Sequence, residues 1–432
     1  MCPSRSSSLG PSGNSLPAHR TCRRAATVHP TQQTAADEAD LRAFCEARAC
    51  YRRGSIRERV RSQVFERLSS GDVMDRLDVG QTGGVYTVRD ECPQDAKDSP
   101  PMAVFKSEGE EGFARRGILP GCGAVREEAA YLLDRLTGSV AGVPVTLRTA
   151  VPVGVLGRKL EDAAGRKELE RHSPAARGGL VSGAVQSFVP GVLGAAEDFG
   201  MPRDLTSAAR VVSTAAAQQI ACLDIRLCNT DRHGGNLLFQ YGQHGDIHPS
   251  ASAADGIYRP VPIDHGCTLP RWWAMGEANF EAWADWPQVH APCLPEVLDI
   301  IEAAVERREE AVRMLAELGL EPAAQATYYI AVSLLYEGTV RHGLSLACVA
   351  GLLSRNAINP GEPSWLEARM VELASDMGMA LGWVEDSYGD RVPAAPEDED
   401  AWPPKEFLNR LLALFASAET KAAGLAWREE WG

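Results

Sequence analysis

The sequence predicts an α+β fold with two lobes, a small lobe built on an antiparallel sheet followed by a lobe rich in helices. Between about residues 70 and 190, short runs of alternating apolar and polar residues are separated by glycine, proline and polar turns, which is typical of strands. From about residue 205 onward, apolar residues recur at helical spacing over longer segments. We therefore expect an N-terminal lobe over residues 70–190 and a C-terminal lobe over residues 191–385.

The composition is that of a globular protein without a spanning helix. The chain has 432 residues, of which 44% are hydrophobic and 24% charged. Its net charge of −14 argues against a nucleic-acid partner. The 11 Cys form no CxxC pair and no zinc-type block, which favours reduced thiols in an intracellular protein, cytoplasmic or peripheral to a membrane. No apolar run approaches the length of a membrane-spanning helix.

The first 36 residues differ from the rest of the chain. They contain no Asp or Glu, four Arg and many Ser and Thr. This composition is typical of a disordered tail, and it is equally a feature of organelle transit peptides. We expect residues 1–40 to be a tail of one of these two kinds, and both interpretations stay open.

The strand-rich lobe is predicted from segments in which apolar and polar residues alternate, from turns between them and from one amphipathic helix. The glycines that mark its first turn are Gly80, Gly83 and Gly84. The elements expected up to residue 190 are a helix over about 37–69, two strands within 72–90, a strand over 102–108, a helix over 123–138, and strands within 143–154 and 180–190. A polar insertion is expected at about 158–178, between the last two strands.

The second lobe is predicted to be mainly helical, with two short strands near its start. Its expected elements are a helix over 207–227, strands at 236–240 and 259–264, helices within 295–320, 322–343, 344–355 and 365–383, a linker over 386–404 and a C-terminal helix within 405–432.

Two short stretches, DIRLCNTDRHGGN (224–236) and VPIDHG (261–266), concentrate polar side chains. A glycine-bearing loop separates Asp231 from Asn236 and can direct both side chains to one centre, while an apolar strand delivers Asp264 to its end. Alone, Asp231 could be a helix cap or turn residue, and Asp264 an Asx turn. His233, within the first stretch, would either relay a hydroxyl proton or stabilise the loop.

These stretches follow two further candidates in the order that phosphoryl transfer requires. Such a site needs a glycine turn, a strand Lys oriented by a helix Glu, an Asp at the attacking hydroxyl, and an Asn and an Asp for magnesium. Lys106 ends the strand AVFK, and Glu127 lies on the next helix. Separately these residues would be a solvated Lys, a surface carboxylate and a hairpin turn. Together with Asp231 and Asp264 they favour a two-lobed, protein-kinase-like fold.

LDIRLCNTDRHGGNLL and PIDHGCTLP resemble the catalytic and metal-binding loops of the phosphatidylinositol 3-/4-kinase superfamily, and especially those of the type II and plant gamma-type phosphatidylinositol 4-kinases. The likeness covers roughly residues 70–375. It implies that ATP and Mg²⁺ are the cofactors, that Lys106 binds ATP phosphates and that Asp231 is catalytic. It also implies that Asn236 and Asp264 bind the metal. Backbone groups of a hinge would read adenine, and the hinge residues are Gln186, Ser187, Phe188 and Val189.

The acceptor is less firmly indicated than the phosphoryl donor. Between Asp264 and Trp286 there is one basic residue, Arg271, against three acidic ones, which disfavours a polyphosphorylated head group. We expect phosphatidylinositol and its inositol 4-hydroxyl; a protein hydroxyl is the alternative, and a nucleotide-binding scaffold without turnover is a third. Trp272 and Trp273 would either make a peripheral membrane contact or pack against the helical lobe.

Overall fold

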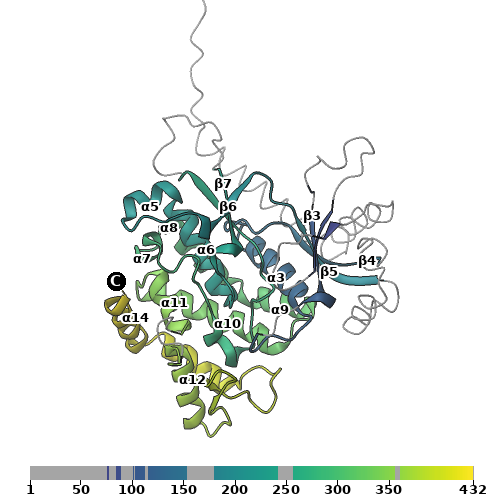
Figure 1. Cartoon of the computed structure of the whole chain (residues 1–432). Coiled ribbons are helices and arrows are strands. Elements are labelled where there is room, and N and C mark those ends of the chain that lie inside the picture. Colours follow the sequence, from purple (N-terminus) through teal and green to yellow (C-terminus); the bar gives the residue numbers. More distant parts are fainter. Residues whose placement is uncertain are drawn as a thin grey trace, which may run out of the picture. The chain divides into compact units, whose positions relative to one another are not determined.

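Antiparallel sheets and helices make up the described part of the chain (Figure 1). The computed structural model describes residues 75–76, 84–88, 101, 103–111, 115–152, 180–241, 256–355 and 361–431. All of them belong to one compact unit of the chain, residues 61–432. The tail predicted at 1–40, the helix at 37–69 and the insertion at 158–178 lie outside the described residues. The mixture of helix and antiparallel sheet confirms the α+β class.

The first sheet has five strands in the order β1-β2-β3-β5-β4, and all its pairs are antiparallel. Its strands are β1 (Asp75–Arg76), β2 (Val85–Val88), β3 (Ala103–Ser107), β4 (Thr146–Pro152) and β5 (Leu180–Ser187). Strand β3 is central, and Lys106 lies opposite Val85 on one side and Ala184 on the other. The side chains of Tyr86 and Phe105 are buried on one face of the sheet, and Lys106 lies on the opposite face, where it meets Glu127.

Helix α3 (Gly123–Leu136) packs against β4, β5 and α9, between the sheet and the helices (Figure 1). Its apolar side comprises Val125, Ala129 and Leu133, all buried. The Asp134 carboxylate accepts hydrogen bonds from two backbone N–H groups of the connection into β4, at 3.1 and 3.0 Å. This helix was predicted from its periodicity, and the structure confirms it to within two residues at its C-terminus.

A second, three-stranded sheet places two loops at one end. Strands β6 (Val192–Ala195), β7 (Leu237–Tyr241) and β8 (Tyr258–Pro262) pair antiparallel in sequence order. In β7 and β8, Leu237 is the register partner of Pro262. The residue before β7 and the residues after β8 therefore lie at the same end of the hairpin, which brings Asn236 close to the start of the VPIDHG turn.

Most of the remaining described residues form helices, with α10 at their centre. The α-helices up to residue 376 are α5 (Leu205–Val211), α6 (Thr214–Leu227), α7 (Pro287–His290), α8 (Pro295–Glu306), α9 (Arg308–Leu318), α10 (Pro322–Tyr336), α11 (Leu346–Leu353) and α12 (Trp365–Asp376). Helix α10 is buried along most of its length and packs against α6, α8 and α9. Among the described residues, no helix is long and apolar enough to cross a bilayer.

Two helices that the periodicity predicts as continuous are each divided in the structure. The segment 207–227 is broken at Val212, which is extended, and Ser213 caps the N-terminus of α6 by accepting the Ala216 N–H at 3.1 Å. The segment 295–320 is broken at Arg307, whose φ and ψ are −98° and 9°. Apolar spacing continues across both breaks, so it could not reveal them.

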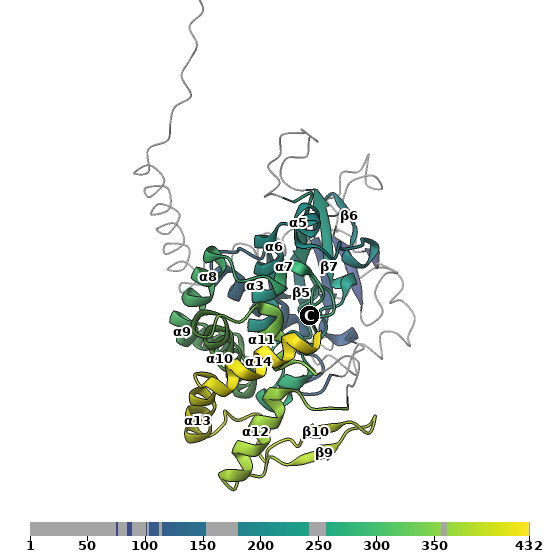
Figure 2. The same cartoon turned by 90° about the vertical axis from the view of Figure 1, so that its left-hand side faces the viewer.

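The C-terminal residues also differ from the prediction of a linker and one helix. Strands β9 (Trp383–Glu385) and β10 (Arg391–Pro393) form a hairpin, and two helices follow, α13 (Lys405–Phe415) and α14 (Ala418–Trp431) (Figure 2). Helix α13 buries Phe407, Leu411 and Phe415. At the break, the Thr420 hydroxyl donates to the Leu414 carbonyl at 2.8 Å. Helix α13 is therefore part of the core.

Candidate functional site

The structure brings Lys106 together with the two carboxylates predicted to accompany it. Its Nζ forms an ion pair with Glu127 and lies 3.1 Å from Oδ1 of Asp264. Burial by itself would lower the pKa of Lys106, but the charges of Asp264 and Glu127 outweigh it and raise that pKa. The ammonium group therefore remains charged, and the sequence expectation of a Lys–Glu pair is met.

Glu127 is held ionised although its side chain is only 2% exposed. Burial alone would raise its pKa, yet Lys106 and His265 lower it well below the ordinary value. The His265 ring is fully buried, with Nδ1 at 3.8 Å from Glu127 Oε2, beyond hydrogen-bond range. Neither of its ring nitrogens has a hydrogen-bond partner among the described residues. The sequence analysis did not single out His265, although it follows Asp264 directly.

Asp264 adopts a backbone conformation that directs its side chain to the site. Its φ is +57°, in the left-handed region, which Asp tolerates better than most residues. It follows β8 by two positions, and its side chain is 47% exposed. One carboxylate oxygen contacts Lys106, while the exposed remainder of the group is open to a ligand.

The loop between α6 and β7 carries Asp231 and rests on a buried ion pair. Arg232 and Asp224 are both fully buried, with Nε at 2.9 Å from Oδ2. The Asp224 carboxylate also accepts the indole N–H of Trp283 at 2.9 Å and the amide of Asn229 at 3.0 Å. The two charges are therefore paired and hydrogen-bonded, as buried charges must be. Sequence reasoning missed this pair, although both residues lie in the DIRLCNTDRHGGN stretch.

Arg232 also ties the two predicted loops to each other. Its Nη1 donates to the carbonyl of Ile263 at 2.8 Å and to the carbonyl of Asn236. The Ile263 N–H in turn donates to the Asn236 carbonyl at 3.1 Å. One buried guanidinium thus fixes Asn236 and the residue before Asp264 relative to each other.

Asn236 and Asp264 offer oxygen ligands that suit Mg²⁺. The Asn236 side-chain N–H₂ donates to the Asp231 carbonyl at 3.0 Å, which leaves its amide oxygen as the available acceptor. Among the described residues, no group of three or more His, Cys, Asp and Glu side chains could hold a metal alone. Mg²⁺ commonly binds one or two protein oxygens and takes its other ligands from phosphates and water. The donor set therefore fits a magnesium ion that binds with a nucleotide.

Asp231 is paired with a basic side chain from the segment that precedes α3. It forms an ion pair with Arg115, a residue that sequence analysis did not select. Burial raises the pKa of Asp231, while Arg115 and His233 oppose that shift. His233 Nδ1 accepts the Gly235 N–H at 3.1 Å, which supports its loop-stabilising role; its part in proton relay stays a prediction.

The residues predicted to contact the nucleotide are only partly described. Gly80 and Gly83 lie outside the described residues. Gly84 is buried, and its carbonyl accepts the Ser107 N–H at 3.1 Å. A side chain at position 84 would overlap the Glu110 carboxylate, which would have to move.

The predicted hinge joins the five-stranded sheet to β6. Gln186 is buried and donates its side-chain amide to Thr146 Oγ1 at 3.0 Å, and the Ser187 N–H donates to the Val145 carbonyl at 2.8 Å. These two residues complete the sheet. Phe188 and Val189 follow it without regular structure, and the reading of adenine by this segment stays a prediction.

Trp272 and Trp273 are core residues, so of the two alternatives left open by the sequence, the bilayer contact is wrong. They are 1% and 5% exposed. Their indole N–H groups donate to the carbonyls of Ala401 at 3.0 Å and Glu399 at 3.2 Å. The packing alternative is therefore confirmed, and the partners come from the segment predicted as a linker.

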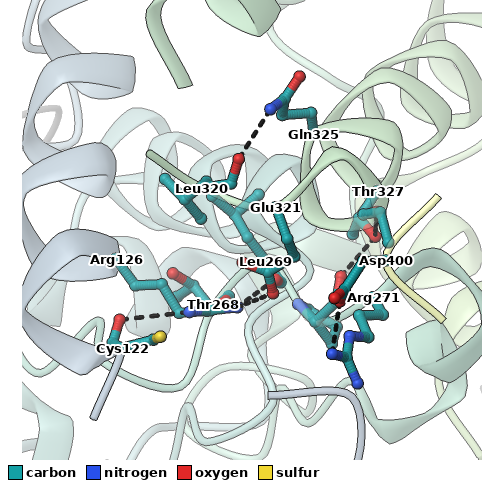
Figure 3. A network of polar contacts seen from close by, with 12 residues as sticks. Cys122, Arg126, Thr268, Leu269, Arg271, Leu320, Glu321, Gln325, Thr327 and Asp400 are labelled. Carbon is teal, nitrogen blue, oxygen red and sulfur yellow. Dashed lines mark hydrogen bonds and ion pairs between the residues drawn. The ribbon is translucent and has the colours of Figure 1, made fainter. Parts of the chain in front are cut away.

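A polar network connects helix α3 to the chain that follows Asp264 (Figure 3). Arg126, beside Glu127, is fully buried; its Nε donates to the Thr268 carbonyl at 2.9 Å, and its Nη2 lies 2.6 Å from Glu321 Oε1. Farther along, Arg271 pairs with Glu399 at 2.7 Å and with Asp400. The helix that carries Glu127 is thus anchored to the segment that carries Asp264.

About two thirds of the chain is similar to plant proteins named as phosphatidylinositol 4-kinases. It is 30% identical over 311 residues to phosphatidylinositol 4-kinase gamma 4 of Oryza sativa subsp. japonica (68% of this chain, 47% of the relative). It is 30% identical over 309 residues to phosphatidylinositol 4-kinase gamma 6 of Arabidopsis thaliana (68% and 45%), and 29% identical over 321 residues to gamma 3 of that plant (69% and 49%). No protein-family model matches the chain. The chain spans about half the length of these relatives, and the resemblance predicted from the sequence is confirmed.

Proposed function

This chain is a relative of the plant gamma-type phosphatidylinositol 4-kinases, and we propose that it transfers the γ-phosphoryl group of ATP to the inositol 4-hydroxyl of phosphatidylinositol. The observation that carries the proposal is the position of Lys106 between Glu127 and Asp264. Residues from three separate elements converge there in the arrangement that phosphoryl transfer needs. In this proposal the five-stranded sheet with α3 is one lobe of a kinase-like fold, and the helices with the β6–β8 sheet are the other.

Each residue has a role that its surroundings support. Lys106, kept charged by two carboxylates, binds nucleotide phosphates. Asn236 and Asp264 hold Mg²⁺, which supplies charge neutralisation on the phosphates when it is bound. Asp231 accepts the hydrogen bond of the attacking hydroxyl and so orients it. Catalysis then consists of positioning and electrostatic stabilisation by groups fixed in advance.

The choice of phosphatidylinositol over more phosphorylated lipids rests on charge. The segment from His265 to Trp286 has one basic residue, Arg271. Its guanidinium is already paired with Glu399 and Asp400. A head group with several phosphates would require several free cations, whereas phosphatidylinositol presents a single phosphodiester.

A protein serine/threonine kinase of the same fold is the second candidate. The observation that favours it is the burial of Trp272 and Trp273, which removes the membrane contact that the sequence suggested. Both candidates share the nucleotide and metal residues and differ only in the acceptor. A scaffold without turnover is disfavoured, because Lys106, Asp231 and Asp264 are all retained.

The acceptor is tested with full-length protein and γ-labelled Mg-ATP. Separate reactions contain phosphatidylinositol vesicles, phosphatidylcholine vesicles, a generic protein substrate or no acceptor. We expect label in phosphatidylinositol, at the 4-position when the deacylated product is resolved against 3- and 5-phosphate standards. Label in protein alone would support the protein-kinase alternative instead. Absence of label in every reaction would contradict both kinase candidates.

A further inference from the structure

A short turn preceding α3 reaches across to the catalytic loop. The turn comprises residues 115–118 and is closed by a hydrogen bond from the Ile118 N–H to the Arg115 carbonyl at 3.0 Å. The Gly117 carbonyl accepts the Arg271 N–H at 2.8 Å, and φ of Gly117 is +73°. The turn is therefore docked on the segment after Asp264, and this docking delivers the Arg115 guanidinium to the Asp231 carboxylate.

Other described cations of this region are committed to partners. Lys106, Arg232 and Arg271 are each held by the carboxylates described above. Arg116, the neighbour of Arg115, is turned toward β10, where it donates to a backbone carbonyl. Arg115 differs from these, because its side chain is 43% exposed and the Asp231 carboxylate that it contacts is 25% exposed.

The pairing conflicts with the role proposed for Asp231. A hydroxyl that is to be oriented by Asp231 must form its hydrogen bond to the carboxylate that Arg115 now contacts. A partly exposed ion pair contributes little to stability, so replacing this one by a contact with substrate costs little. When a guanidinium leaves a carboxylate next to a phosphoryl-transfer centre, phosphate oxygens are its new partners. It binds them through two parallel N–H donors.

We propose that Arg115 is a phosphate-binding residue of the active site, which neutralises Asp231 while the site is empty and moves to a phosphate oxygen when substrates bind. This inference rests on the proposed function and deepens it. The phosphate has two potential sources, the γ-phosphate of ATP and the phosphodiester of phosphatidylinositol. Both lie beside the acceptor hydroxyl during transfer, and the test separates them.

The variants are Arg115→Ala and Arg115→Lys, with Arg210→Ala as the matched control. Arg210 is an exposed arginine on α5, away from the residues of the site. Thermal unfolding verifies that all three variants are folded. Binding is measured by calorimetry with Mg²⁺ and a β,γ-imido analogue of ATP, with Mg-ADP, and by co-sedimentation with phosphatidylinositol-containing or pure phosphatidylcholine vesicles. Transfer kinetics give KM for each substrate.

We expect Arg115→Ala to lower kcat/KM by about 100- to 1,000-fold, the range for loss of one charge-stabilising donor, and Arg115→Lys to recover part of it. If the γ-phosphate is the ligand, the variant loses affinity for the ATP analogue while its affinity for ADP is unchanged. If the phosphodiester is the ligand, nucleotide affinity is unchanged, and KM for phosphatidylinositol rises with loss of vesicle binding.

These measurements distinguish a failure of the Arg115 inference from a failure of the proposed function. If the wild-type protein transfers no phosphate but its binding of either probe depends on Arg115, the proposed function is wrong and this inference stands. If Arg115→Ala matches Arg210→Ala in binding and in kcat/KM, the inference is overturned while the proposed function stands. Absence of binding to every probe by the wild-type protein would overturn both.

Discussion

The Nζ atom of Lys106 lies 3.1 Å from Oδ1 of Asp264, a residue 158 positions later in the chain. This contact links the five-stranded sheet to the end of β8. Glu127, from α3, completes the arrangement by pairing with the same ammonium group. A single Lys thus joins three elements, and its removal should affect both nucleotide binding and stability.

Lys106→Met should abolish phosphoryl transfer and lower the free energy of unfolding by about 3–5 kcal/mol, because Glu127 would remain as a buried carboxylate without its cation. Denaturant unfolding and nucleotide titration measure the two effects. The double variant Lys106→Met/Glu127→Gln removes the stranded charge. We expect it to regain most of the stability and none of the activity, and recovery of activity would contradict the role of Lys106.

Asp224→Ala should destabilise the protein by about 3–5 kcal/mol, because Arg232 would lose its buried counter-charge and Trp283 its acceptor. The change lies beneath the catalytic loop, so residual folded protein should also have a lower kcat. Chemical unfolding of Asp224→Ala and Asp224→Asn, with Asp299→Asn on the surface of α8 as the control, checks this. A wild-type unfolding midpoint for Asp224→Ala would contradict the buried pair.

The segment that the sequence predicted as a linker should contribute to stability. Replacing Glu399 and Asp400 by their amides removes both anionic partners of Arg271, which is largely buried. We expect a loss of about 1–2 kcal/mol in unfolding free energy that shrinks in 1 M NaCl, where exposed charges are screened. Truncation after residue 396 should cost far more, because it also removes the buried Phe407, Leu411 and Phe415.

Glu111 should make stability depend on pH in a defined direction. Burial raises the pKa of Glu111 to about 7, although the backbone N–H of Gly123 opposes the shift. Between its ordinary pKa of about 4.5 and pH 7, the folded state therefore holds the proton more tightly than the unfolded state. Raising the pH through this window favours unfolding.

The comparison with Glu111→Gln isolates this effect, because every other titrating group is common to both proteins. From pH 4.5 to pH 8 the wild-type protein should lose about 1–2 kcal/mol relative to the variant, after allowance for solvent screening. Urea unfolding at several pH values measures the difference. Parallel pH profiles for the two proteins would show that Glu111 is not perturbed.

The sequence predicted those site residues whose position follows from local pattern. Lys106 ends an alternating strand, Glu127 lies on an amphipathic helix, and Asp264 follows an apolar strand, so each was placed by its own element. Their convergence was inferred from the order that phosphoryl transfer requires, and the structure confirms it for these three residues.

The residues that sequence reasoning missed act through contacts distant in sequence or through burial. Arg115 is 116 positions from Asp231, and no periodicity relates the two. Asp224 looks like an ordinary charge near a helix end and Arg232 like one of the following loop, because the packing that buries them is not visible locally. Trp272 and Trp273 were ambiguous for the same reason, since their partners come from residues 399–401.

The central claim is that Lys106, Asp231, Asn236 and Asp264 form one phosphoryl-transfer site, and Asp264→Asn tests it most directly. The measurement is the rate of transfer from γ-labelled Mg-ATP to phosphatidylinositol vesicles by wild-type protein and by Asp264→Asn, each with its thermal unfolding curve. The account predicts that the variant loses at least about 100-fold in rate while it unfolds at nearly the wild-type temperature, because the Asp264 side chain is half exposed. Wild-type transfer by a folded Asp264→Asn protein would contradict the account.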